Sequence, residues 1–273
     1  MILPLSERET SLLIVSKSSP STNSELVSRA VHGDRLTDFT VLVTDDQTAG
    51  RGRLGRAWSA PAGTGLAISV LVRSALPAGG FPTADSIGWL PIAAGVAMTD
   101  AVAALVPGRP VGFKWPNDVQ IEGRKVCGIL SEVVPHGDPD GLAVVIGAGL
   151  NLTMTAAQLP VPTATSLVIE GAEGDSGLAD RALSGYLREL RELVGALWSA
   201  HGDAEKSGLR AAAIQRCTTL GGAVRVELPG RSDRSGVAVG IDRAGRLLVQ
   251  DESGRVEAVA AGDIIHLRGE VHA

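Results

Sequence analysis

The chain has 273 residues, of which 44% are hydrophobic and 3% aromatic, and its formal net charge is −5. This length allows one large domain, or a large domain with a small appended one. The few aromatic residues argue against a stacking surface for single-stranded nucleic acid, and the acidic balance gives no overall attraction to DNA or RNA.

Cysteine and histidine usage argues against a metal or disulfide framework. Cys127 and Cys217 lie far apart and have no C-x-x-C partner, and the 5 histidines show no ligand spacing. No apolar run approaches the length of a membrane span, and the N-terminus does not have the pattern of a signal peptide. We therefore expect a cytoplasmic protein without a membrane partner.

Short runs rich in Val, Ile and Leu predict strands through the first part of the chain. These runs are residues 12–15, 40–44, 65–72, 111–115, 119–121, 125–134 and 142–146. Helices are predicted at 25–31, 91–106 and 178–198, the last from leucines at helical spacing with charged residues opposite. Pro91 suits a first turn, and the alternative is an earlier start with a kink at Pro91. After Gly221-Gly222 come closely spaced short strands, at 224–228, 236–241, 246–250 and 255–259, which predict a small β-barrel.

The segment from Thr48 to Trp58 interleaves three glycines with three arginines. Glycine lets a backbone approach a ligand closely, and arginine is always charged and matches carboxylate or phosphate, so the segment predicts a loop that covers an anion. Its glycines also spell G-x-G-x-x-G. The residues that follow have no helical period and are broken by Pro61 and Gly63, so a dinucleotide-binding fold is not expected.

A second cluster begins at Lys114-Trp115-Pro116-Asn117-Asp118, where proline restricts the turn that carries the polar side chains. A tight turn at 121–124 then places Lys125 at the start of a strand. Gly128, inside that strand, and the run 147–152, at the end of the next strand, suggest close approach of a ligand. Together these features predict a floor for a flat, anionic and partly apolar ligand.

These motifs together resemble the biotin protein ligases. The resemblance rests on residues 50–58, 114–119, 124–130 and 147–151, which occur in the family's order, and on Ser21-Thr22-Asn23, which otherwise would be interpreted only as a helix cap. It implies an α+β fold, with a mixed β-sheet flanked by helices of the class II synthetase-like type. Residues 1–220 would form the catalytic domain and residues 221–273 a small SH3-like barrel. Bifunctional members add an N-terminal winged-helix domain, for which this chain has no room, so a monofunctional ligase without a DNA partner is expected.

The resemblance also implies an activity. Biotin and ATP, with Mg²⁺, would give biotinyl-5′-AMP, and biotin would then pass to a lysine of the biotin carboxyl carrier domain of an acyl-CoA carboxylase. The implied catalytic residues are Lys125 and Arg53. The implied biotin contacts are Ser21, Thr22, Asn23, Gln47, Gly50, Arg51, Gly52, Arg53, Lys125 and Gly128. The implied nucleotide contacts are Arg51, Arg53, Trp58, Asn117, Asp118 and Asn151. No protein ligand is implied for the metal, and the oligomeric state, monomer or weak dimer, stays open.

Two other functions are compatible with parts of the pattern. A lipoate ligase or octanoyltransferase shares the catalytic fold, and Cys127 could then carry an acyl group, although a small thiol inside a strand is usually core packing. A nucleic-acid or ligand-sensing module could use the arginine segment on phosphates without catalysis. The Trp-Pro-Asn-Asp turn argues against the first and the acidic composition against the second.

Overall fold

A seven-stranded mixed sheet forms the centre of the protein, in the order β1-β2-β5-β9-β8-β7-β6. The computed structural model describes residues 1–32, 36–74, 83–135, 142–227, 233–260 and 263–266. The strands are β1 (Leu12–Val15), β2 (Thr40–Thr44), β5 (Gly65–Arg73), β6 (Val111–Lys114), β7 (Asp118–Ile121), β8 (Arg124–Val133) and β9 (Ala143–Asn151). Strand β1 pairs in parallel with β2, and the other neighbouring pairs are antiparallel. The predicted mixed sheet is therefore confirmed.

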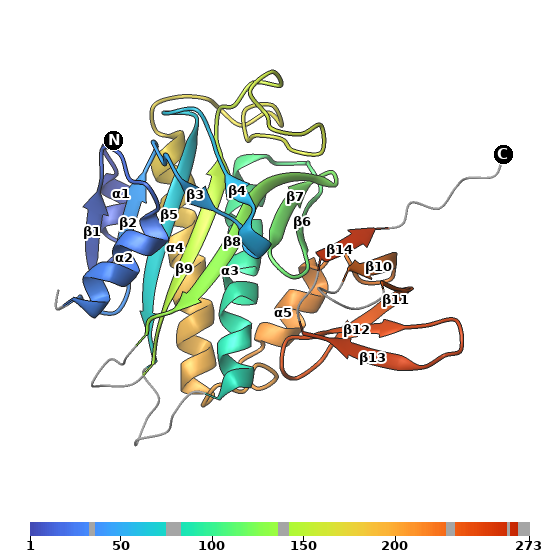
Figure 1. Cartoon of the computed structure of the whole chain (residues 1–273). Coiled ribbons are helices and arrows are strands. Elements are labelled where there is room, and N and C mark those ends of the chain that lie inside the picture. The colour runs from blue at the N-terminus through green and yellow to red at the C-terminus, as the bar shows by residue number, and fades with distance from the viewer. Residues whose placement is uncertain (33–35, 75–82, 136–141, 228–232, 261–262, 267–273) are drawn as a thin grey trace.

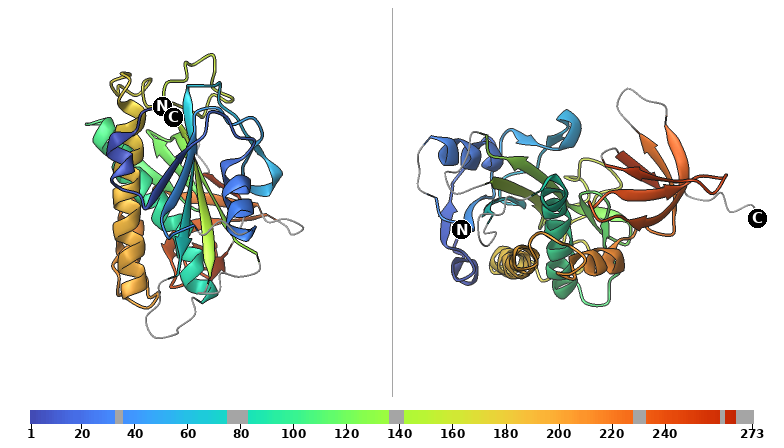
Figure 2. Two further views of the ribbon diagram at one scale, coloured as in Figure 1. Left: turned by 90° about the vertical axis from the view of Figure 1, so that its left-hand side faces the viewer. Right: turned by 90° about the horizontal axis from the view of Figure 1, so that it is seen from below.

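Helices cover both faces of this sheet (Figures 1 and 2). On one face lie α3 (Ala84–Leu105) and α4 (Leu178–Ser199), with α1 (Pro4–Glu7) and α5 (Leu209–Arg216) beside them. On the other face lies α2 (Thr22–Val31), whose Leu26 packs with alternate residues of the central strands. Because both faces are buried, the central strands are continuous apolar runs, and this is why their positions could be predicted.

Helix α3 begins earlier than the predicted Pro91. Thr83 caps its first turn, with Oγ1 accepting from Ser86 N at 3.2 Å, and Pro91 lies inside the helix. This is the alternative that the sequence left open, because proline favours a first turn but also occurs inside a helix, where it can kink it. Among the described helices, α3 is the one long and apolar enough to cross a membrane, and 67% of its most apolar window is buried inside the protein.

Several elements were not predicted. Strand β9 continues to Asn151 rather than ending at 146, because its glycines pair within the sheet, Gly147 with Ser69 and Gly149 with Gly128. A two-stranded ribbon joins β3 (Gly50–Arg51) to β4 (Ala57–Trp58), with a 3₁₀ turn (Arg53–Gly55) between them. As expected, no α-helix follows these glycines. The short α1 and α5 were also missed.

A second, antiparallel sheet of five strands stands beside the first (Figure 1), in the order β13-β12-β11-β10-β14. Its strands are β10 (Ala223–Glu227), β11 (Arg234–Ile241), β12 (Leu247–Gln250), β13 (Val256–Val259) and β14 (Asp263–His266). Residue 228, predicted as strand, lies outside the described residues, and β14 was missed. Buried residues of this sheet, such as Val224 and Leu247, belong to the same core as the large sheet.

Two turns of the small sheet are built in the same way but lie in different surroundings. In each, an aspartate carboxylate, Asp242 or Asp251, accepts from the backbone N–H groups two and four residues later, and a glycine follows with positive φ. The turn ending at Gly245 is docked on the large domain, because Trp89 Nε1 donates to Arg243 O at 2.8 Å and Trp115 Nε1 donates to Gly245 O at 2.9 Å. A Cβ at Gly254 would have nothing within 4 Å.

This pair of turns gives a matched test of the contact between the two sheets. A Cβ at Gly245 would lie 2.8 Å from Ile92 Cδ1. We expect Gly254→Ala to lower the free energy of unfolding by about 1 kcal/mol, the cost of a left-handed non-glycine residue. Gly245→Ala should cost about 1 kcal/mol more, because it also overpacks the interface. Urea denaturation followed by tryptophan fluorescence measures both, and equal losses would contradict a docked turn.

Candidate active site

A β-bulge in β8 turns Lys125 out of the core. Lys125 lies opposite Gln120 and Cys127 lies opposite Val119, so that Val126 is the extra residue. Regular alternation would put Lys125 on the same face as Cys127. With the bulge, Val126 and Cys127 are both buried in the core, and Lys125 points to the other face of the sheet. Bulges often re-aim a side chain in this way beside a functional site.

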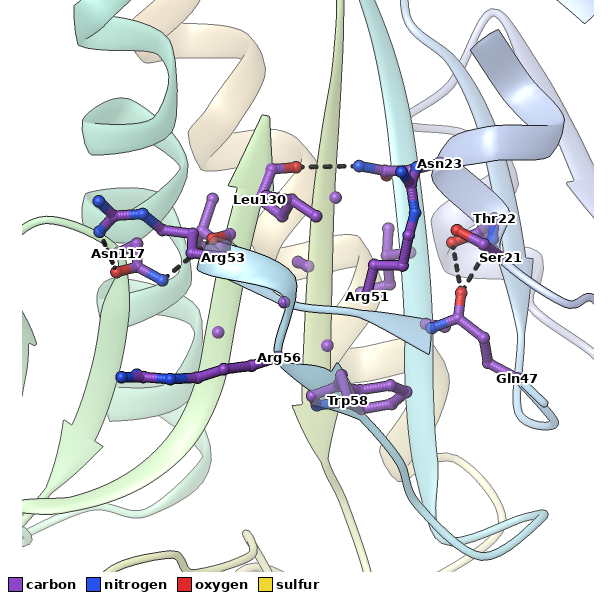
Figure 3. Close-up of a pocket in the computed structure, with 18 of the residues that line it drawn as sticks. Ser21, Thr22, Asn23, Gln47, Arg51, Arg53, Arg56, Trp58, Asn117 and Leu130 are labelled. Atoms are coloured by element: carbon purple, nitrogen blue, oxygen red, sulfur yellow. Dashed lines mark hydrogen bonds between the residues drawn. The ribbon is translucent and has the colours of Figure 1, made fainter. Parts of the chain in front are cut away.

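Lys125 lines a pocket on the α2 side of the sheet, under the segment 50–58 (Figure 3). The pocket is open to solvent, and the space between its walls, including the open mouth, is about 840 Å³. Its wall comes from α2, the arginine segment, β5, β7, β8 and β9. Segments far apart in the sequence therefore meet at one concave surface.

Three glycines form the floor of this pocket, and each leaves room for one particular side chain. A Cβ at Gly128 would lie 3.0 Å from Lys125 Nζ. A Cβ at Gly147 would overlap the carboxamide of Asn23, and a Cβ at Gly149 would overlap the indole of Trp58. The close approach predicted for Gly128 is thus made first of all by the protein's own side chains.

A polar network occupies the α2 end of the pocket. Thr22 donates to Gln47 Oε1 from its backbone nitrogen at 2.8 Å and from its hydroxyl at 3.1 Å. Ser69 Oγ lies 2.8 Å from Thr22 Oγ1 and donates to Asn23 Oδ1 at 2.6 Å. Ser21 is the N-cap of α2 and accepts from Ser24 N, so its capping role is confirmed. All these side chains are held by partners before any ligand is considered.

Cationic side chains occupy the other end. Lys125 Nζ lies 2.7 Å from Asp118 Oδ1. Arg53 Nη1 donates to Asn117 Oδ1 at 2.9 Å, and Asn117 in turn donates to Ile129 O at 3.2 Å (Figure 3). Asn117, in the turn before β7, and Asp118, the first residue of β7, therefore orient Arg53 and Lys125.

Most predicted site residues meet in this pocket. Those that line it are Ser21, Thr22, Asn23, Gln47, Arg51, Gly52, Arg53, Trp58, Asn117, Asp118, Lys125 and Gly128. Gly50 and Asn151 do not line it. Gly50 pairs with Trp58 in the ribbon, and Asn151 Nδ2 donates to Thr165 O at 2.9 Å, which ties down the segment after β9. The ligand contacts assigned to all these residues stay predictions.

Gly147, Ala148 and Gly149 belong to the run 147–152 that the sequence predicts as part of the floor, and they line the pocket. The alternating glycines of β9 indicate this floor in the sequence, because a strand with glycine at every second position leaves one face of the sheet open. Other lining residues had no ligand contact assigned from the sequence, namely Arg56, Ala57, Ala67, Ile68, Ile129 and Leu130. Ala67 and Leu130 carry no such indication, since only the sheet register brings them to the pocket.

Cys127 does not face this pocket. It is buried on the helix side of β8, and burial, with a smaller contribution from Asp118, raises the pKa of its thiol to about 12, although Lys125 opposes the shift. A nucleophilic thiol needs a lowered pKa and access to substrate. The alternative in which Cys127 carries an acyl group therefore loses its support.

The model of the biotin/lipoate A/B protein ligase family matches residues 15–151. The chain belongs to this family. A second model, the biotin protein ligase C-terminal domain, matches residues 219–267 and covers the small sheet. The family predicted from the motifs is confirmed.

Named relatives agree with this assignment. The chain is 41% identical over 251 residues to the biotin–[acetyl-CoA-carboxylase] ligase of Mycobacterium tuberculosis, covering 91% of this chain and 86% of that protein. It is 33% identical over 245 residues to the ligase of the same name from Paracoccus denitrificans, covering 88% and 95%. Among solved structures, the Aquifex aeolicus biotin protein ligase in complex with biotin and ATP superposes with a TM-score of 0.72 at 26% identity, covering 94% of this chain and 99% of that one.

The raised pKa of Cys127 predicts an unreactive thiol. At pH 8, well below a pKa of about 12, the thiol is protonated, and burial also blocks access. In a Cys217→Ser variant, we expect Ellman's reagent to label Cys127 only after the protein is unfolded in urea. Rapid labelling of the folded protein would contradict the burial of this thiol.

Proposed function

We propose that this protein is an ATP-dependent biotin protein ligase. It activates biotin to biotinyl-5′-AMP and then transfers biotin to a lysine of the biotin carrier domain of an acyl-CoA carboxylase. The observation that carries the proposal is one pocket with two unlike ends, a polar end at Thr22 and Gln47 and a cationic end at Arg53 and Lys125. The names of the relatives in Mycobacterium and Paracoccus support the same activity.

The polar end suits the ureido ring of biotin, which offers N–H donors and a carbonyl acceptor. Thr22 and Gln47 present oxygen and nitrogen atoms there, while the neighbouring walls at Ala67 and Ile68 are apolar. A pocket that is mainly apolar with a few fixed polar atoms both binds and orients a small ligand. The valeryl chain would then lead toward the cationic end.

The cationic end suits the first chemical step. The carboxylate of biotin attacks the α-phosphate of ATP, and pyrophosphate leaves. Both reactants are anions, so the transition state requires positive charge that is already in position. Lys125 and Arg53 supply it, because Asp118 and Asn117 hold them at the same side of the pocket. The indole of Trp58, seated on Gly149, gives the adenine an apolar surface.

Mg²⁺ is part of the proposal through ATP rather than through a protein cage. Among the described residues, no group of three or more His, Cys, Asp or Glu side chains is arranged to hold a metal ion. Of the described residues that line the pocket, Asp118 is the one carboxylate, and it is paired with Lys125. These residues fit a magnesium ion held by phosphate oxygens and water, where it neutralises phosphate charge.

The transfer step needs an acceptor amine at the mixed anhydride. The carrier lysine would enter at the open mouth of the pocket, beside the segment 50–58, and AMP would leave. Arg53 would keep the adenylate in place until the carrier arrives, because it lies in that segment and contacts Asn117 across the pocket. We expect the segment to be mobile without ligand and ordered with the adenylate bound.

Removal of the Lys125 charge tests the activation step. We expect Lys125→Ala to lower biotin-dependent ATP–pyrophosphate exchange by about a hundredfold, since one charge contact at a transition state is worth about 3 kcal/mol. The matched control is Lys206→Ala, because Lys206 also pairs with an aspartate, Asp203, but lies outside the pocket. Near-normal exchange by Lys125→Ala, with lipoate or biotin as the acid, would refute the catalytic role.

Removal of Arg53 tests retention of the intermediate. We expect Arg53→Ala to release labelled biotinyl-5′-AMP about tenfold faster, because one charge-assisted contact is lost. Filtration of the preformed complex over time measures this rate. Arg109→Ala serves as a control, since Arg109 lies away from the pocket and pairs with Glu122. An unchanged release rate would show that Arg53 does not hold the adenylate.

A further inference from the structure

Glu132, near the end of β8, ties the arginine segment to helix α2 at the polar end of the pocket, without lining the pocket itself. Its carboxylate accepts from Arg51 Nη2, with both oxygens at 2.9 Å, and its Oε2 accepts from Asn23 Nδ2 at 3.0 Å. Arg51 belongs to the arginine segment and Asn23 to the first turn of α2. One side chain thus contacts two segments that are far apart in the sequence.

The contact with Asn23 fixes the polar end. Asn23 Nδ2 donates to Leu130 O at 3.0 Å as well as to Glu132, and Asn23 Oδ1 accepts from Ser69. Both amide hydrogens and the amide oxygen are therefore engaged, which sets the orientation of this carboxamide. Through Ser69 the chain of contacts continues to Thr22 and its partner Gln47.

The contact with Glu132 holds the Arg51 guanidinium beside the polar network without using up its hydrogen-bond donors. Within the part of the chain that the structure describes, Arg51 contacts Glu132 and Ser24, in each case through Nη2. A guanidinium has five N–H donors in a rigid plane, so Nε and Nη1 keep their hydrogens for another anion. Figure 3 shows the Arg51 side chain extending toward Asn23, across the space above the glycine floor.

We propose that Glu132 is a positioning residue for biotin, which sets Arg51 at a fixed distance from the polar network so that one ligand can reach both. This inference rests on the proposed ligase function. The carboxylate of biotin then binds to an arginine that is already oriented, and the ureido ring binds to a network held by the same glutamate. A preoriented partner strengthens binding because less freedom is lost when the ligand enters.

The test is the dependence of ATP–pyrophosphate exchange on biotin concentration. Glu132→Ala removes both contacts, and we expect the KM for biotin to rise about tenfold, with a smaller change in kcat, because a binding contact rather than a reacting group is disturbed. Glu132→Gln keeps the shape and one acceptor oxygen but loses the charge, so we expect a rise of about threefold. The KM for ATP should change less than the KM for biotin in both variants.

The route through Arg51 is tested by a double-mutant cycle. If Glu132 acts through Arg51, then Glu132→Ala should add little to the KM of an Arg51→Ala variant, because contacting residues are not additive. Glu122→Gln is the matched control. Glu122 pairs with Arg109 at 2.9 Å, and Arg109 is 45% exposed, close to the 49% of Arg51. Neither Glu122 nor Arg109 lines the pocket.

The outcomes are distinct. A raised KM for biotin in both Glu132 variants, lost in the Arg51→Ala background and absent in Glu122→Gln, supports the proposal. Wild-type KM values in Glu132→Gln and Glu132→Ala, an additive cycle, or tighter biotin binding after loss of Glu132 would overturn it. If Glu132→Ala does not fold, the nearly isosteric Glu132→Gln still decides. Absence of biotin-dependent exchange in the wild-type protein would refute the proposed function instead.

Discussion

Strand β9 must fill the core on one face and leave space on the other, and the site depends on this division. Its even-numbered residues, such as Ile146 and Leu150, belong to the core that includes α3 and α4, while Gly147 and Gly149 face the pocket. Any side chain at those two glycines would occupy the volume of Asn23 or Trp58. The pocket is thus made by the absence of side chains in the middle of a well-packed sheet, where the floor is rigid.

Three cations of the site are held by oxygen partners that belong to the large sheet or its turns. Lys125 pairs with Asp118 and Arg51 with Glu132, while Arg53 donates to the amide oxygen of Asn117. A cation held in this way needs little reorganisation when an anion arrives, and its partner limits the repulsion between neighbouring cations. The same arrangement lets several positive groups stand close together in a chain whose net charge is −5.

The sequence was most informative where burial repeats along the chain. Strands β2 and β5 and helix α4 were placed within a residue or so, because their apolar patterns follow from burial on both faces or on one stripe. The motifs also predicted most of the pocket. The β-bulge at Val126 could not be predicted, because the residues from Lys125 to Ile129 also fit regular alternation.

Contacts between segments distant in the sequence could not be predicted either. Glu132 stands in the sequence as an exposed-looking glutamate near a strand end, and its role depends on the distance to Arg51 and Asn23, which only the folded chain sets. Gly50 and Asn151 show the opposite case. Both lie in motifs of the family, yet they shape the ribbon and the segment after β9 rather than the pocket wall.

The docked turn at Gly245 lets the small sheet help to position the residues of the site, so this sheet is not an independent module. Trp115 donates its indole N–H to that turn and its backbone N–H to Thr219 Oγ1 at 3.0 Å, and it stands two residues before Asn117, the partner of Arg53. Separation of the two parts would break the hydrogen bonds of Trp89 and Trp115 and expose their shared apolar core to water, which is costly. The two tryptophans bind backbone carbonyls of the turn, so the requirements on its side chains come from the turn itself, at Asp242 and Gly245. The two sheets are therefore separate regions of the sequence, but their stabilities are coupled.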